Sequence, residues 1–143
     1  PISFHRRLKR FHAGWRDAST YAFVIVDKDD RILLGGITLS NVRRGVAQSG
    51  SIGYWIGEPH ARNGYMGEAV QLMLTFAFDT LRLHRVEAAC LPSNEASRAV
   101  LLKAGFTQEG LARRYLRING EWRDHLTFAI LRTDPRPSVP VYV

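Results

Sequence analysis

The first half of the chain shows the pattern of apolar and polar residues that is typical of β-strands. Residues 21–26 and 32–39 are rich in β-branched and aromatic residues, and a polar turn separates them. In residues 46–57, one side of a predicted strand carries the large residues Ile52, Tyr54 and Ile56. This pattern predicts an antiparallel hairpin followed by a third strand.

Two segments show a helical period. Residues 64–83 carry apolar side chains at steps of three and four, at Met66, Val70, Met73, Leu74, Ala77 and Leu81. This spacing predicts a long helix packed on a sheet. Residues 4–15 place apolar side chains on one side and basic ones on the other, which predicts an amphipathic helix.

The next segment contains clear start and stop signals. Residues 85–91 predict a short strand that ends before Pro92. Asn94 is suited to the N-cap of a helix over Glu95–Ala104, and Gly105 is suited to its C-terminal end.

The last predicted elements form a hairpin. Residues 115–118 and 122–131 flank Asn119-Gly120, a dipeptide typical of tight β-turns. The complete order is helix, three antiparallel strands, long helix, strand, helix and hairpin. It predicts one α+β (mixed α/β) domain over 1–143, with a largely antiparallel sheet flanked by helices and an irregular tail at 133–143.

Composition narrows the class of protein. The chain has 143 residues, of which 45% are hydrophobic and 23% charged, which fits one globular domain and excludes general disorder. No apolar run has the roughly 18 residues of a membrane span, so no membrane partner is expected. The single cysteine, Cys90, excludes an internal disulfide and a zinc cluster, and it favours a cytoplasmic location with no metal site.

The charge suggests an anionic partner. The net charge is +7, and 17 of the 20 cationic residues are arginine, which binds phosphate and carboxylate groups through its planar fork. A basic surface that serves solubility alone explains the same numbers. The apolar residues of 4–15 follow one helix face and do not interleave with the basic ones, so direct nucleic-acid binding is not expected there.

Candidate chemistry concentrates where the third strand meets the long helix. This junction contains Gly64 and Gly67, and a helix N-terminus with glycine nearby suits a phosphate group. The spacing matches neither the dinucleotide fingerprint nor the nucleotide-triphosphate loop. The junction therefore predicts either a phosphate site or a turn with a packing role alone.

Three motifs in register resemble the GCN5-related N-acetyltransferase (GNAT) superfamily, in particular its branch that acetylates α-amino groups of ribosomal proteins. Residues 62–69 resemble the pyrophosphate loop for acetyl-CoA, and 94–106 resemble the Asn-initiated helix closed by Gly-Phe. Residues 118–125 resemble the closing hairpin of the branch. The resemblance extends over 21–132.

The resemblance implies an acetyl-CoA-dependent transferase and a set of residues that bind this acetyl donor: Trp55, Ile56, Arg62, Asn63, Gly64, Tyr65, Met66, Gly67 and Asn94. The loop departs from the family pattern at Ala61 and Met66, so binding is expected to rely on main-chain N–H groups. Family members begin with a strand and a helix that precede residues 4–15, so the chain resembles an N-terminally shortened form.

Two residues are candidate proton carriers. Glu58 resembles the acidic residue that the superfamily often places after this strand, as a base for the attacking amine. Many relatives protonate the thiolate with a tyrosine, but Leu101 stands at that position. Ser97 matches a serine of the ribosomal-protein branch and becomes the candidate donor. The alternatives are a solvated loop glutamate and an ordinary helix-start serine.

The expected acceptor is the N-terminus of a ribosomal protein. A protein α-amine has a pKa of about 7.7–8.0 against about 10.4 for lysine, so it needs little help to become the neutral nucleophile. The alternatives are a small-amine or antibiotic acetyltransferase, and a non-catalytic CoA-binding or ribosome/RNA-binding module. Homo-oligomer formation is left open.

Overall fold

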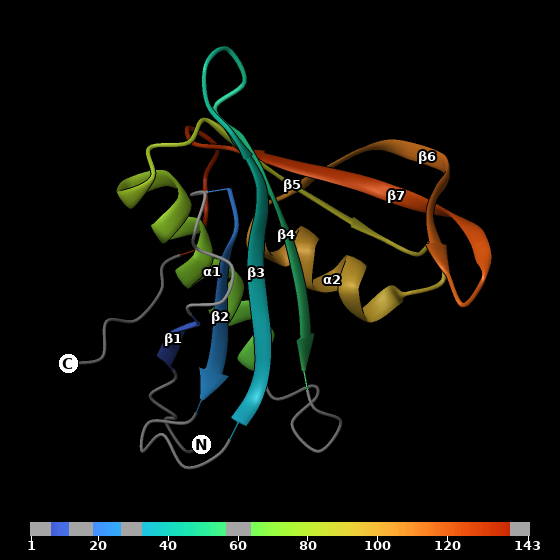
Figure 1. Cartoon of the computed structure of the whole chain (residues 1–143), viewed down its shortest axis with the longest axis horizontal. Coiled ribbons are helices and arrows are strands. Elements are labelled where there is room, and N and C mark those ends of the chain that lie inside the picture. The colour runs from blue at the N-terminus through green and yellow to red at the C-terminus, as the bar shows by residue number, and fades with distance from the viewer. Residues whose placement is uncertain (1–6, 12–18, 27–32, 57–63, 138–143) are drawn as a thin grey trace.

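A computed structural model describes residues 7–11, 19–26, 33–56 and 64–137 (Figure 1). They form one seven-stranded sheet of order β1-β2-β3-β4-β5-β7-β6. Its strands are β1 (Arg7–Phe11), β2 (Tyr21–Val26), β3 (Leu33–Arg43), β4 (Ser49–Ile56), β5 (Arg85–Cys90), β6 (Thr107–Ile118) and β7 (Glu121–Leu131). The helices are α1 (Tyr65–Thr75), its π-helical continuation η3 (Phe76–Thr80) and α2 (Glu95–Ala104).

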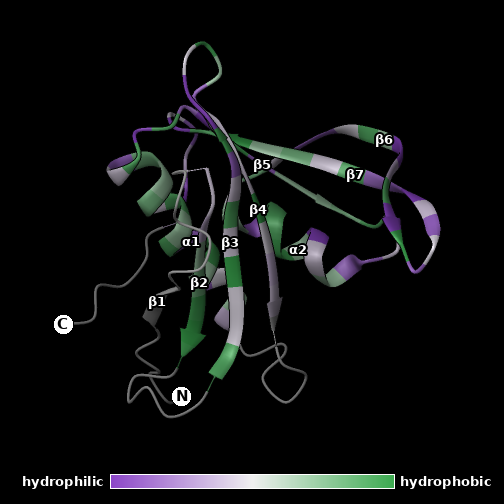
Figure 2. Ribbon diagram, viewed as in Figure 1, coloured by the Kyte–Doolittle hydropathy of each residue, from purple (hydrophilic) through white to green (hydrophobic). Residues whose placement is uncertain are grey.

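The sheet is antiparallel except at its centre, where β4 and β5 run parallel. The two α-helices lie against the same face of the sheet (Figure 1). The core fills the space between them, with Val70, Met73, Val86 and Leu101 fully buried. Hydrophobic residues recur along α1, β2 and β3, whereas the far end of the β6–β7 hairpin is largely hydrophilic (Figure 2). The predicted α+β class is confirmed.

Predictions that relied on local signals are confirmed. β2 and β3 pair antiparallel, with Tyr21 opposite Leu39. Asn94 caps α2 and Gly105 ends it in the left-handed region, at φ 109°. Asn119 and Gly120 both have positive φ, which matches the tight turn that their types favour.

The predicted helix over 4–15 is wrong for Arg7–Phe11, which form an edge strand; the rest of that segment lies outside the described residues. β1 pairs antiparallel with β2, from Arg7 opposite Val26 to Phe11 opposite Ala22. A short amphipathic helix is marginal without a surface to pack on, and the edge of β2 offers backbone partners instead. Side-chain periodicity carries no information about such an edge.

Two other elements differ in extent from their predictions. The long helix changes to π-helical geometry at Phe76, so 64–83 is not one regular helix. β6 begins at Thr107, well before residue 115. Nearly all of β6 is exposed and two bulges interrupt its pairing with β7, so it lacks the alternation from which a strand is recognised. No helix among the described residues is long and apolar enough to span a membrane.

Candidate active site

The two parallel central strands separate from each other part-way along their length. Ser49–Ser51 pair with Arg85–Glu87, and no further pairing joins the described residues of the two strands. β4 continues along β3 as far as Ile56, which lies opposite Gly35. The strands diverge visibly in Figure 1, where β5 turns away from the lower half of β4. The sheet therefore has a gap, and two hollows border it.

The first hollow is a cleft of about 780 Å³ between the end of β4 and the starts of α1 and α2. It gathers seven of the predicted site residues: Trp55, Gly64, Tyr65, Met66, Gly67, Asn94 and Ser97. Tyr54, Glu95, Ala96 and Val100 complete its lining. Ile56 ends β4 beside this cleft, whereas Glu58, Arg62 and Asn63 lie outside the described residues.

The start of α1 has the features of an anion site. Gly64 is the N-cap, at φ 78°, and no side chain caps this helix among the described residues. The N–H groups of a first helical turn have no acceptor within the helix itself, and they carry partial positive charge. At Gly67 a Cβ would meet nothing within 4 Å, so the backbone there is open to a ligand in the cleft.

The start of α2 has its own cap. The Asn94 Oδ1 atom accepts a hydrogen bond from the Ser97 N–H at 3.0 Å. This contact confirms the predicted N-cap role of Asn94. The Asn94 amide side chain thus accepts a hydrogen bond from a first-turn N–H group of α2. No side chain of the described residues does the same for the first turn of α1.

A hydroxyl pair lies inside the cleft. The Tyr54 Oη and Ser97 Oγ atoms are 2.7 Å apart, which joins β4 to the first turn of α2. Sequence reasoning did not assign a role to Tyr54, although its phenol interrupts an otherwise apolar strand face, a signal that could have found it. Burial raises the pKa of Tyr54, and the hydrogen bond with Ser97 opposes this rise.

Cys90 lies on β5 near this pair and is buried. Burial raises the pKa of its thiol, while hydrogen bonding with Ser97 and the charge of Arg98 oppose the rise. A buried thiol with a raised pKa is a poor nucleophile, as expected for a structural cysteine.

Trp55 is the most exposed aromatic residue of the site, with 56% of its surface accessible. Its indole lies against β3, where a Cβ on Gly36 would come within 2.6 Å of Nε1. Gly36 therefore makes room for the Trp55 ring, and this packing fixes the ring at the rim of the cleft.

The second hollow, of about 500 Å³, contains Ser51, Gly53, Arg85, Glu87 and Ala89 in its lining. These residues alternate with core residues along β4 and β5, so they face away from the helices. Ile52 and Ala88 reach this hollow too, at the gap between the strands. The gap thus separates the cleft on one face from a groove on the other.

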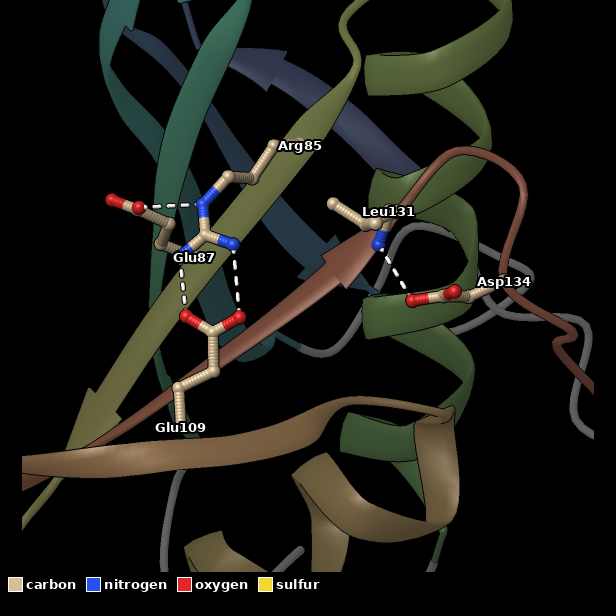
Figure 3. Close-up of polar contacts among 5 residues, drawn as sticks. All are labelled: Arg85, Glu87, Glu109, Leu131 and Asp134. Carbon is tan, nitrogen blue, oxygen red and sulfur yellow. Dashed lines mark hydrogen bonds and ion pairs between the residues drawn. The ribbon is translucent and has the colours of Figure 1, made fainter.

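An ion-pair cluster forms the polar wall of this groove (Figure 3). Arg85 binds Glu109 through both terminal nitrogens, at 3.0 and 2.5 Å, and Glu87 through Nε at 2.8 Å. These contacts raise the pKa of Arg85 and lower that of Glu109. Because the pKa of Glu109 is lowered on folding, its contribution to stability is present above its unfolded pKa of about 4.3 and is lost as the pH falls below it.

Figure 3 also shows how β7 ends. The Asp134 Oδ2 atom accepts a hydrogen bond from the Leu131 N–H at 2.9 Å, in the turn after the strand. This contact stabilises the end of β7. Because β7 pairs with β5, it also supports the β5 side of the gap.

A model of the family described as "Acetyltransferase (GNAT) domain" matches residues 2–107. The chain belongs to the GNAT acetyltransferase family. By family it is therefore an acyltransferase, as the three motifs led us to expect.

The GNAT chain is similar to several curated proteins. It is 40% identical to the Probable N-acetyltransferase YjcK of Bacillus subtilis, over 90% of this chain and 71% of that protein. It is 33% identical to the [Ribosomal protein uS5]-alanine N-acetyltransferase of Escherichia coli, over 96% of this chain and 71% of that protein.

Solved structures agree with this assignment. Mycobacterium smegmatis RimJ in complex with CoA-disulfide aligns with a TM-score of 0.77 and 40% identity, over 81% of this chain and 55% of that one. A ribosomal-protein-S5-alanine acetyltransferase from Vibrio fischeri aligns with a TM-score of 0.76 and 36% identity, over 82% of this chain and 64% of that one. The GNAT chain thus spans less than two thirds of either solved relative.

The residues of the cleft fit acetyl-CoA. The volume of the cleft, about 780 Å³, lies in the range of about 300–1,000 Å³ that is usual for ligand pockets. The start of α1 offers N–H groups for a pyrophosphate, and the open backbone at Gly67 permits close approach. The gap between β4 and β5 lies between this cleft and the groove on the other face.

Proposed function

We propose that this chain transfers an acetyl group from acetyl-CoA to the α-amino group of a protein N-terminus, with a ribosomal protein as the favoured acceptor. The observation that supports it most is the gap between β4 and β5, which has a cleft on one face and a groove on the other. A thioester held in the cleft and an amine held in the groove would meet there. The relatives that are named as acetyltransferases of a ribosomal protein favour this acceptor.

The acetyl donor would lie along the cleft. Main-chain N–H groups of the segment 63–67 would hold the pyrophosphate, with Arg62 adding charge from the loop. Tyr65, Met66, Trp55 and Ile56 would contact the rest of the donor, and Asn94 would approach its pantetheine arm. Glycine at positions 64 and 67 keeps side chains away from the phosphates.

The acceptor would enter by the groove. Glu87 and Glu109 bring two negative charges against the single positive charge of Arg85, so this wall is net negative. A net negative wall attracts a protonated amine and raises its local concentration.

The chemistry needs three contributions from the chain. Glu58 would take a proton from the attacking amine through water, and a main-chain N–H at the end of β4 would stabilise the oxyanion. As the C–S bond breaks, Ser97 would give its hydroxyl proton to the thiolate sulfur. The proton lost by the amine replaces it through water, so that one proton moves in net from nitrogen to sulfur while the N–C bond forms.

A peptide panel tests the acceptor. We expect acetyl-CoA to acetylate peptides with a free α-amine, and to leave peptides with a blocked N-terminus and free lysine unmodified, as measured by mass spectrometry. Turnover of spermidine or an aminoglycoside in place of the peptides would contradict the α-amine assignment. Calorimetry with acetyl-CoA tests the cofactor separately; absence of binding at 1 mM donor (roughly −4 kcal/mol of binding free energy) would contradict the transferase itself.

The two proton carriers are expected to differ in their pH dependence. Glu58→Gln should lower turnover most at neutral pH and recover above about pH 8, where the α-amine loses its proton unaided. Ser97→Ala should lower turnover below the thiol pKa of about 8.5 and matter less above it, because the thiolate then leaves without a proton. Wild-type turnover of both variants at pH 7 would contradict these roles.

A further inference from the structure

The Tyr54–Ser97 contact raises the question of which hydroxyl donates. A serine hydroxyl has one proton and two acceptor sites, so Ser97 can serve a ligand as a donor if it accepts from Tyr54 and not otherwise. The two oxygens are 2.7 Å apart, within the range of a good O–H···O bond. The direction of this bond therefore decides whether the Ser97 proton is available to another acceptor, of which the neighbouring Cys90 thiol is one and a ligand in the cleft would be a second.

The chemistry of the two hydroxyls favours Tyr54 as the donor. A phenol is a stronger acid, and hence a stronger hydrogen-bond donor, than an alkyl hydroxyl. Burial holds the phenol in its protonated form, because it raises the pKa of Tyr54. The backbone of Ser97 is already held by the Asn94 cap, so the hydroxyl torsion is the main freedom left to this residue.

We propose that Tyr54 is a positioning residue: it donates to the Ser97 Oγ atom and thereby turns the Ser97 hydroxyl proton toward the sulfur of bound CoA. This proposal rests on the proposed function, because it assigns the sulfur to this part of the cleft. Tyr54 keeps its own proton throughout. Its pKa lies above the ordinary value of about 10 and a thiol's lies near 8.5, so net proton transfer from the phenol to the thiolate would be uphill.

Binding of CoA itself gives a test that needs no acceptor. If Ser97 donates to the sulfur, it stabilises the thiolate and lowers the pKa of bound CoA. CoA should then bind more tightly as the pH rises from 7 to 9.5, relative to desulfo-CoA, by about tenfold. Desulfo-CoA removes from the comparison what the titratable and charged groups around the pair contribute to binding the rest of the ligand, namely Tyr65 on α1, Cys90 on β5, and Glu95 and Arg98 on α2.

Tyr54→Phe removes the hydroxyl and keeps the ring. We expect the pH-dependent gain in CoA affinity to be about fivefold smaller in this variant, which is the value of one ordinary hydrogen bond. Desulfo-CoA should bind as before. Ser97→Ala should lose the gain as well, and the double variant should be no worse than Ser97→Ala alone, because Tyr54 acts through Ser97. Ser97→Thr keeps a hydroxyl and should retain the gain when Tyr54 is present and lose it with Tyr54→Phe.

The matched control is Tyr21→Phe, which removes a hydroxyl from a buried tyrosine on β2, outside the cleft. It should leave the gain unchanged. If thermal melting shows that Tyr54→Phe does not fold, Tyr54→Met, which also lacks the hydroxyl, takes its place.

The outcomes separate the two proposals. A missing gain in the wild type, an unchanged gain in Tyr54→Phe, or additive losses in the double variant would each overturn the role of Tyr54. An equal loss of CoA and desulfo-CoA affinity in Tyr54→Phe would also overturn it, since it would show a structural role. A gain that depends on both residues in a chain that acetylates no α-amine peptide would support Tyr54 and reject the proposed acceptor.

Discussion

The two helices that border the cleft begin in opposite ways. α2 starts at an asparagine whose side chain accepts the Ser97 N–H. α1 starts at Gly64 in the left-handed region, and no side chain of the described residues caps it. One helix start is thus satisfied from within the protein, and the other has the features that would suit a ligand.

This difference separates stability from binding. An Asn cap stabilises a helix by about 1 kcal/mol, and a glycine cap that offers no side chain leaves the first-turn N–H groups to solvent or an anion. Both helix starts line the same cleft, and we therefore expect different roles for them. Substitution of Gly64 should therefore act mainly on ligand affinity, and loss of the Asn94 cap should act mainly on folding stability.

Gly64→Val should give the largest effect. A β-branched residue is strained at φ 78°, so the loop should shift, and the new side chain should stand near the phosphates. We expect the Kd for acetyl-CoA to rise at least about 50-fold by calorimetry, against about fivefold or less for Arg62→Ala, which removes one exposed contact.

Gly45→Val is the matched control for that change. Gly45 also has a left-handed backbone, at φ 62°, and open space around its Cβ position, but it lies outside the cleft. It should lower stability and leave acetyl-CoA affinity unchanged. Equal small losses from Gly64→Val and Arg62→Ala would contradict the role of main-chain N–H groups.

Gly67→Ala should move stability and binding in opposite directions. Alanine in a helix is more favourable than glycine by about 0.5–1 kcal/mol, and its Cβ would meet nothing in the ligand-free protein. The melting temperature should therefore rise while the Kd for acetyl-CoA increases about tenfold, because the methyl group holds the phosphates off the backbone. Tighter binding together with higher stability would place the ligand elsewhere.

Asn94→Ala should act on the other helix start. Loss of the cap should lower the free energy of unfolding by about 1 kcal/mol, and Asn94→Asp should retain most of it, since aspartate is an equally good cap. Chemical denaturation measures both. A rise of more than about tenfold in the Kd for acetyl-CoA would show that Asn94 contributes more to the ligand than to the helix.

Inorganic pyrophosphate should give the smallest effect. At a concentration equal to its Kd it should stabilise the protein by about 0.4 kcal/mol, or about 1–2 °C in melting temperature. The shift should disappear in Gly64→Val and persist in Asn94→Ala. A shift that grows in Asn94→Ala would place the anion at α2 and reverse the comparison.

The sequence predicted those parts whose signals are local. Asn94, Gly105 and Asn119-Gly120 have conformational preferences that depend on neighbours a few residues away, and the caps and the turn stand where these preferences put them. The hairpin of β2 and β3 followed from two apolar strands with a short connection. The seven predicted site residues that line the cleft were expected from motifs that resemble the GNAT superfamily. These motifs lie at the end of one strand and at the starts of two helices.

The failures have one physical origin. Arg7–Phe11 pair with an edge whose availability depends on the rest of the sheet, and β6 is an exposed strand held by its partner β7. Side-chain periodicity reports which face of an element is buried, and it reports little about elements that are stabilised by backbone pairing. Such strands are recognised when their partners are known.

By itself, then, the sequence determined most of the elements, the cap and end of α2, and the turn at Asn119-Gly120, because these depend on interactions over a few residues. Tertiary structure decided where the elements meet: the gap between β4 and β5, and the bond between Tyr54 and Ser97, which are 43 positions apart. The physical reason is that strand divergence and a 2.7 Å contact across a cleft depend on how a whole sheet twists and packs on its helices. No local preference encodes that arrangement.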